Sequence, residues 1–302
     1  MVPRSPPNHA TGGNAGSGSP VGRAVSFVSA VSSRSDPLDT ALRVTVHFHP
    51  DRVFSGEPIL QAMARDGVYR SQFETLTSNG GLTANQGREG ARWKWESRIF
   101  GGVYDDAPAS QRPRYGALDH LRRTVGGSPR FGSAHLRLAP HTLARTTFCF
   151  PDSYHEPRDF GVAACMPLIT LVEAHRLNPP TGWDPLDTYI EAHIHGPIRF
   201  DHDVEALVLD PSHRATDTHK LAAALPCPVE WHEGFRVCAD TLRANLEYRG
   251  REYVDLALSL AQGGWLTPRM IGDAARTGLH NEQALKRVWH YLARFGAPDA
   301  PA

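Results

Sequence analysis

The sequence predicts an α+β protein in which short β-strands and small helices precede a helical C-terminal segment. Between residues 39 and 212, short runs rich in β-branched and aromatic residues alternate with Gly- and Pro-rich turns. Beyond residue 213 the apolar residues recur at the helical spacing of about 3.6. A chain of 302 residues is long enough to bury a substantial core.

The beginning of the chain differs in composition from the rest. Residues 1–38 are rich in Gly, Ser, Pro and Asn and poor in large apolar residues. Such a segment buries too little apolar surface to offset the entropy of ordering it. We therefore expect a disordered tail over residues 1–38, a catalytic domain over residues 39–212 and a helical segment over residues 213–302.

Several elements are expected at the start of the folded region. The run LRVTVHF (residues 42–48) is typical of a strand, which Pro50 would end. The run GEPILQAMARDG (56–67) is typical of a short helix with a proline in its first turn and a glycine at its end. VYRSQFET (68–75) is expected to form a second strand, and the Gly- and Asn-rich residues 77–90 a loop.

Later runs predict more strands and the C-terminal helices. SAHLRLAP (133–140) and RTTFCF (145–150) are typical of strands. Residues 187–200 and 203–210 predict a hairpin, because a Gly-Pro turn interrupts two β-rich runs. Helical spacing is found in the C-terminal runs 252–264 and 281–296.

Charge and hydropathy give no sign of nucleic acid or a membrane as partner. The 32 basic and 32 acidic side chains balance, so no global field attracts either. No apolar run approaches the roughly 20 residues of a membrane helix, and the N-terminus has no secretory apolar core. We expect a cytoplasmic protein, with specialised export left open. The expected free thiols are Cys149, Cys165, Cys227 and Cys238.

Two His-x-His pairs suggest a metal site as one alternative. His47 and His49 share one face of the first strand, and His193 and His195 share a face of a later one. Neutral imidazoles are good ligands for zinc, and Glu191 or Asp51 could then act as a base. Sixteen histidines make chance pairs common, however, and no H-E-x-x-H motif supports this interpretation.

The order of four motifs carries a resemblance to a known fold. HFHPDR, then ILQAMARDG, then FGGVYDDAPASQRPRYG and finally YIEAHIHG follow one another along the chain. This order resembles the His-Tyr-Glu branch of the ADP-ribosyltransferase fold, which implies a split antiparallel β-sheet and NAD as the substrate. The resemblance places His49 at the ribose, Tyr104 and Tyr115 around the nicotinamide, and Glu191 as the catalytic carboxylate. Pro50 departs from the glycine of that family's motif.

The chemistry explains why such residues belong together. Breaking the bond between nicotinamide and ribose creates oxocarbenium-like charge on the sugar, which a carboxylate such as Glu191 stabilises. Stacked tyrosine rings fix the nicotinamide, and His49 can hydrogen-bond the ribose hydroxyls. Ser71 and Asn79 are further candidates for the NAD site, and Arg130 for a phosphate contact. Each has a simpler structural alternative in a turn, a strand or a packed core.

A second resemblance is stronger but carries no activity. The segments YRSQFET, RPRYGAL and GGSPRFGS are similar to an uncharacterised bacterial family, domain-of-unknown-function family 3626. The face of the late strand that bears Glu191, His193 and His195 is polar throughout, so we expect it to border a cleft or water.

These observations predict an NAD-dependent ADP-ribosyltransferase-like enzyme. It would carry out mono-ADP-ribosyl transfer or NAD glycohydrolysis, with Glu191 and His49 as its catalytic residues. The acceptor and the role of the C-terminal helices stay open, as does a role as toxin, effector or housekeeping enzyme. The alternatives are a metal-dependent hydrolase, with His47, His49, His193 and His195 as ligands, and a non-enzymatic binding module.

Overall fold

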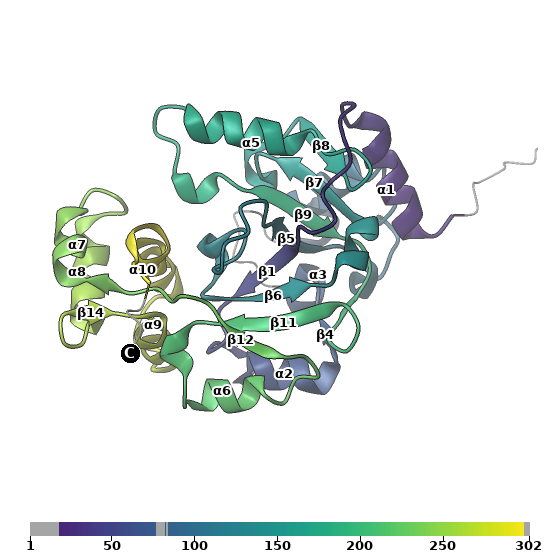
Figure 1. Cartoon of the computed structure of the whole chain (residues 1–302). Coiled ribbons are helices and arrows are strands. Elements are labelled where there is room, and N and C mark those ends of the chain that lie inside the picture. Colours follow the sequence, from purple (N-terminus) through teal and green to yellow (C-terminus); the bar gives the residue numbers. More distant parts are fainter. Residues whose placement is uncertain (1–17, 77–81, 83, 299–302) are drawn as a thin grey trace, which may run out of the picture.

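The structure is a computed structural model, which describes residues 18–76, 82 and 84–298 (Figure 1). Within this part of the chain, eight strands form one sheet in the order β12-β11-β6-β1-β5-β9-β7-β8. Neighbouring strands are antiparallel except β11 and β12. The strands of this sheet are β1 Val44–Phe48, β5 Arg114–Leu118, β6 Ala134–Leu138, β7 Thr146–Phe150, β8 Asp159–Val162, β9 Ile190–Ile194, β11 Val204–Leu209 and β12 Val229–Trp231.

Shorter strands and the helices complete the described part of the chain. Three two-stranded ladders pair β10 Ile198–Arg199 with β4 Val68–Tyr69, β13 Val237–Cys238 with β14 Trp265–Leu266, and β2 Val53–Phe54 with β3 Glu57–Pro58. The α-helices are α1 Pro20–Val31, α2 Ile59–Asp66, α3 Gln72–Thr75, α4 Ala91–Ile99, α5 Leu168–Leu177, α6 Asp217–Ala222, α7 Ala239–Ala244, α8 Arg251–Leu260, α9 Pro268–Arg276 and α10 Glu282–Phe295. The 3-10 helices are η1 Gly87–Glu89, η2 Ala109–Gln111, η3 Pro129–Phe131, η4 Pro140–Arg145, η5 Ser153–His155, η6 Pro185–Asp187 and η7 Pro211–His213.

Alternation along the strands separates two chemically different faces of the sheet. On β9, Ile190, Ala192 and Ile194 belong to the main apolar core, which α2, α5 and α6 cover. The intervening Glu191 and His193 point to the other face, where α1 and α4 contribute a smaller core. The C-terminal helices pack around a third core and stand beside the sheet (Figure 1).

The mixture of strands and helices and several individual elements are predicted correctly. The mixed fold with a mainly antiparallel sheet is confirmed, as are β1, α2, β6, β7, α8 and α10. The eight main strands belong to one hydrogen-bonded sheet, in which β1 and β5 pair only at Val44 and Thr45; the ADP-ribosyltransferase-like fold stays a prediction. No helix in residues 18–76, 82 and 84–298 is long and apolar enough to cross a membrane.

The prediction of a disordered tail over residues 1–38 is wrong for its second half. Residues 20–31 form helix α1, and Ser19 caps its start, because its hydroxyl accepts a hydrogen bond from the Gly22 amide. Ala24 and Val28 of this helix are fully buried against the sheet. The prediction relied on the average composition of residues 1–38, which does not show that residues 20–31 form a short amphipathic run.

The expected boundary at residue 213 is also wrong. Beyond it, β12 still joins the large sheet, and Ala222 and Leu225 belong to the main core. The separate C-terminal core begins with Phe235 and Val237. The chain therefore passes from the sheet to the helical unit near residue 235.

Two predicted strand arrangements are corrected as well. The expected strand over residues 68–75 ends after Tyr69, because Ser71 and Glu74 form a reciprocal capping box that starts α3. The expected hairpin of residues 187–210 does not form: β9 pairs with β5 and β7, whereas β11 pairs with β6 and β12. Strand β10, between them in sequence, pairs with β4 instead.

A buried carboxyl group joins the sheet to the C-terminal unit. Asp51 follows β1, and its Oδ2 has no hydrogen-bond partner within the described residues. Gly272 of α9 lies so close that an added Cβ would overlap this oxygen. Burial raises the pKa of Asp51 from 3.8 to about 6.

Replacing Asp51 with Asn should therefore stabilise the protein at neutral pH. Since the folded pKa exceeds the unfolded one, the wild type loses stability as pH rises from 3.8 to about 6. A shift of this size corresponds to at most ~3 kcal/mol. Urea denaturation should give a larger free energy of unfolding for Asp51→Asn at pH 7 and nearly equal values at pH 4. If wild type and Asp51→Asn had the same free energy of unfolding at pH 7 as well as at pH 4, burial of Asp51 would not destabilise the protein and the prediction would be wrong.

Candidate functional site

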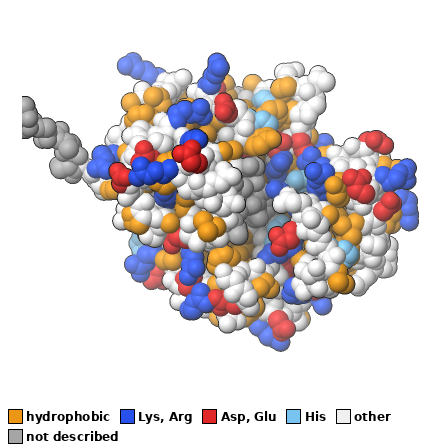
Figure 2. Space-filling view, turned by 180° about the vertical axis from the view of Figure 1, so that it is seen from behind, with side chains coloured by type: hydrophobic (Ala, Val, Ile, Leu, Met, Phe, Trp, Pro, Cys, Tyr) orange, Lys and Arg blue, Asp and Glu red, His pale blue; other side chains and the backbone are white. Residues whose placement is uncertain are grey.

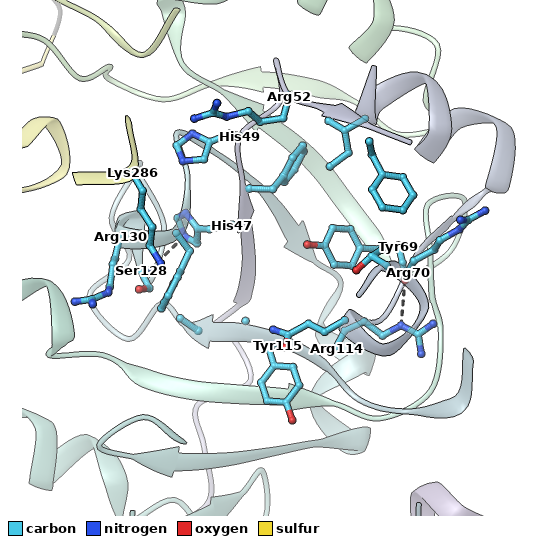
Figure 3. A pocket seen from close by; sticks show the side chains of 18 of the residues that line it. His47, His49, Arg52, Tyr69, Arg70, Arg114, Tyr115, Ser128, Arg130 and Lys286 are labelled. Carbon is cyan, nitrogen blue, oxygen red and sulfur yellow. Dashed lines mark hydrogen bonds between the residues drawn. The ribbon is translucent and has the colours of Figure 1, made fainter. Parts of the chain in front are cut away.

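A cleft of about 360 Å³ opens between the sheet and the C-terminal helices. Its volume lies within the range of small-molecule sites. Figure 3 shows side chains from several elements around it, and Figure 2 shows a groove with basic and histidine side chains between the larger body and the smaller lobe. The cleft is lined by residues of β1, α2, α4, β5, β9 and α10 and of the segments 128–131 and 152–154.

Glu191 of β9 lines the cleft as a buried carboxylate. Its Oε2 accepts hydrogen bonds from the hydroxyl and the amide of Ser153, at 3.0 and 3.3 Å. The guanidinium of Arg92 donates to the same hydroxyl at 3.0 Å. Burial alone raises the pKa of Glu191, but the hydrogen bond from His193 and the charge of Arg92 lower it overall. Glu191 is therefore ionised at neutral pH.

A chain of hydrogen bonds supports Glu191 from behind. Because an ionised carboxylate only accepts, His193 Nε2 must donate to Glu191 Oε1, at 3.0 Å. His193 Nδ1 then accepts from Thr147 Oγ1, at 3.1 Å, and Thr147 accepts from His195 Nε2, at 3.0 Å. Finally, the Tyr104 hydroxyl donates to His195 Nδ1, at 2.8 Å. Burial lowers the pKa of both histidines, so both imidazoles are neutral.

Tyr115 forms the neighbouring part of the wall from β5. Its hydroxyl donates to Glu96 Oε1 at 2.7 Å, and Arg112 donates to the other oxygen of Glu96 at 2.8 Å. The guanidinium of Arg92 lies over the Tyr115 ring at 4.1 Å from its centroid. These contacts hold the ring in one orientation beside Glu191.

A second carboxyl group, Asp152, lines the same cleft. It accepts hydrogen bonds from the Tyr189 hydroxyl and from the amide of Tyr154. The second bond makes Asp152 the N-cap of η5, which starts at Ser153. Burial, followed by the negative charge of Glu191, raises the pKa of Asp152. The two carboxyl groups are thus shifted in opposite directions, a pattern typical of catalytic acid and base pairs.

His47 in β1 and His49 just beyond it have different surroundings. His47 Nε2 accepts from the Ser128 amide at 3.2 Å, and its Nδ1 donates to the Gly132 carbonyl at 3.3 Å. Gly126, at φ +80°, packs so closely on His47 that a Cβ would approach Nε2 to 2.7 Å. His49 lies beyond β1, edge-on to Trp289, with ring centroids 5.2 Å apart. Burial lowers the pKa of His49 well below 6.5, so it is neutral too.

The structure brings together four of the predicted site residues. His49, Tyr115, Arg130 and Glu191 all line the cleft (Figure 3 labels the first three).

Two other residues predicted for the NAD site, Tyr104 and Ser71, do not line the cleft. Tyr104, only 1% exposed, is packed in the core under α1 and α4 and contacts Glu191 only through the chain of hydrogen bonds. Ser71 caps α3, and its hydroxyl donates to the Ala109 carbonyl. Asn79 lies outside the described residues.

The polar face of β9 also differs from its expected setting. The rings of Trp95 and Phe100 cover His193, and Phe100 and Tyr104 cover His195. Only Glu191, at the end of the row, reaches the cleft. The expectation that the whole face borders a cleft or water is therefore wrong.

The four histidines of the metal alternative are not brought to one point. The first pair lies at the end of β1 and the second at the end of β9, with β5 between the two strands. Among the described residues, the ligand groupings close enough for one ion are Cys149–Glu191–His193 and His141–His202–Asp203. Neither combines the two His-x-His pairs. Both nitrogens of His47 already bind the backbone.

Several residues of the cleft were missed by sequence reasoning. Arg92, Asp152, Ser153 and Lys286 stand in runs that match no motif. Their importance depends on contacts across the fold rather than on neighbours in sequence. Only the Asp-Ser start of η5 carries a local signal, that of an N-terminal cap.

The comparisons with known proteins identify a family but no activity. The sequence model of one family, described as "Protein of unknown function (DUF3626)", matches residues 43–178 and 170–295. The match extends over both the sheet and the C-terminal helices. No curated protein matches the chain.

Replacing Tyr104 with Phe tests its position behind the site. The change removes the hydrogen bond to His195 and should lower the free energy of unfolding by ~1–2 kcal/mol. The affinity for any ligand of the cleft should stay within about twofold, because the ring does not line the cleft. Chemical denaturation and calorimetric titration measure the two effects. A large loss of affinity with unchanged stability would place Tyr104 against the ligand instead.

Proposed function

The chain belongs to the DUF3626 family of proteins of unknown function, and we propose that it is an NAD-dependent ADP-ribosyltransferase-like enzyme. The observation that carries this proposal is a buried, ionised Glu191 in the same cleft as the Tyr115 ring and His49. A carboxylate, an aromatic ring and a neutral imidazole are the groups that cleavage of a nicotinamide–ribose bond needs.

Glu191 stabilises the positive charge that develops on the ribose. As the bond from the ribose C1′ to the nicotinamide nitrogen breaks, its electron pair leaves with the nicotinamide, which becomes neutral. The sugar is left with oxocarbenium character, and the nearby carboxylate lowers the energy of this state. His193 and Ser153 fix the orientation of the carboxylate before the reaction, so little reorganisation is needed.

Tyr115 and His49 orient the substrate. The Tyr115 ring, held by Glu96 and Arg92, offers a flat apolar surface for the nicotinamide. The neutral imidazole of His49 hydrogen-bonds a ribose hydroxyl. With water as the nucleophile the products are nicotinamide and ADP-ribose; with an acceptor hydroxyl or amine the product is a mono-ADP-ribosyl conjugate. In both cases the nucleophile loses one proton as it bonds to C1′.

A second candidate function is favoured by Asp152. Its raised pKa suits a general acid, and Glu191 could serve as the partner base, as in hydrolysis of a neutral glycoside. Such a leaving group must be protonated, whereas nicotinamide needs no acid. The two candidates therefore differ in whether Asp152 is required for bond cleavage.

Glu191→Gln should abolish NAD turnover with the fold intact. Removing the negative charge should slow nicotinamide release by on the order of 10²–10³-fold. The matched control is Glu173→Gln, on the exposed surface of α5, which should keep wild-type activity. Nicotinamide release, followed by chromatography, and thermal unfolding give the two readouts. Wild-type-like cleavage by Glu191→Gln would refute the proposal.

Asp152→Asn distinguishes the two candidate functions. If the substrate is NAD, nicotinamide release should continue within about tenfold of wild type, because the leaving group needs no proton. If the substrate is a neutral glycoside, loss of the acid should reduce the rate by about 10²–10⁴-fold. Parallel assays with NAD and with chromogenic glycosides separate these outcomes.

The pH profile gives an independent check. The pKa of Glu191 lies below the ordinary value of 4.5, so the carboxylate is ionised at neutral pH and more than half ionised at pH 4.5. NAD cleavage should therefore keep more than half of its kcat/KM as pH falls from neutral to 4.5. Loss of activity as pH rises past the raised pKa of Asp152 would instead favour the glycosidase.

A further inference from the structure

The C-terminal helix α10 forms one wall of the cleft. Glu282, Gln283 and Lys286 of this helix line it together with residues of the sheet. Trp289 anchors the helix: its Nε1–H donates to the carbonyls of Pro129 and Arg130, at 3.0 and 3.1 Å. The C-terminal unit is thus part of the site.

The same anchor places two cationic side chains side by side. Trp289 binds the backbone at Arg130, and Lys286 lies one turn earlier on the same helix. Burial, followed by the charges of Arg130 and Arg249, lowers the pKa of Lys286. In Figure 3, Lys286, Arg130 and Ser128 lie together at one side of the cleft.

Lys286 differs from the two arginines near it, because each of those arginines forms an ion pair with an aspartate. Arg130 pairs with Asp187, and Arg249 pairs with Asp184. No ion pair of Lys286 occurs within residues 18–76, 82 and 84–298. A cation that is partly buried beside other cations, at a cleft, is suited to bind an anion.

An independent observation at the same place is the side chain of Ser128. This residue lines the cleft and is only 3% exposed, yet its Oγ has no hydrogen-bond partner among the described residues. The amide of Ser128 already donates a hydrogen bond to His47, so the hydroxyl is the group of Ser128 that can still donate to a ligand. A buried hydroxyl without a partner is uncommon, and here it adjoins two cations.

We propose that Lys286, Arg130 and Ser128 bind the diphosphate of a dinucleotide, so that the C-terminal helical unit completes the substrate site. A guanidinium, an ammonium and a hydroxyl together match the several acceptor oxygens of a diphosphate. The apolar side chains of Ile59 and Met63 line another part of the cleft and are available to a base. This inference rests on the proposed function, since it names the group by which that site recognises NAD.

Lys286→Ala tests the proposal, with ADP as the probe in calorimetric titration. The affinity for ADP should fall roughly ten- to a hundredfold, as for loss of a charged hydrogen bond. Lys286→Arg should restore much of it. The control is Arg287→Ala, on the same helix but exposed and bonded to the Tyr253 hydroxyl, which should bind ADP as the wild type does. Thermal unfolding checks that the variants fold.

The outcomes for binding and for cleavage are separable. With NAD as substrate, Lys286→Ala should raise KM with little change in kcat, because the lysine contacts a remote part of the substrate. If the wild type binds ADP through Lys286 but does not cleave NAD, the diphosphate site stands and the proposed function fails. If NAD is cleaved and Lys286→Ala binds ADP as tightly as wild type, this inference is overturned and the function stands. A wild type that binds no ADP overturns the inference as well.

Discussion

The ionised state of Glu191 is the constraint on which this part of the structure depends. A carboxylate accepts hydrogen bonds and cannot donate them, so its neighbour His193 must carry its proton on Nε2. That choice determines the direction of every later hydrogen bond, through Thr147 and His195 to Tyr104. The apolar rings around this row exclude water, which makes an unpaired member costly. His193 and His195 suggest a pair of metal ligands in the sequence, but in the fold they support the carboxylate of Glu191.

The cleft lies where separately built parts of the chain meet. The sheet supplies Glu191 and Tyr115, and α4 supplies Arg92. The C-terminal helices supply Lys286, and Trp289 joins them to the segment that carries Arg130. The model of the DUF3626 family matches both the sheet and the C-terminal helices. This agrees with the arrangement of the cleft, because neither part alone supplies all the residues that line it.

Sequence reasoning succeeded where a structure is encoded by local pattern. Runs rich in β-branched and apolar residues located β1 and β9, and proline and glycine located the ends of α2. It failed where the structure depends on pairing between segments that are far apart in the sequence. In the sheet, β9 and β11 are separated by three other strands, and no local pattern encodes strand order. The Ser71–Glu74 capping box was a readable signal for α3, but the β-rich residues beside it favoured a strand.

The sequence by itself determined the α+β class, the strand that carries Glu191 and the side of that strand on which it lies. These follow from side-chain alternation, a property of neighbouring residues. Only the tertiary structure decided that Glu191 meets Arg92 and Ser153, and that Tyr104 packs behind the site instead of lining it. The physical reason is burial: whether a polar side chain faces a ligand, a core or water depends on which elements cover it, and those elements come from other parts of the chain.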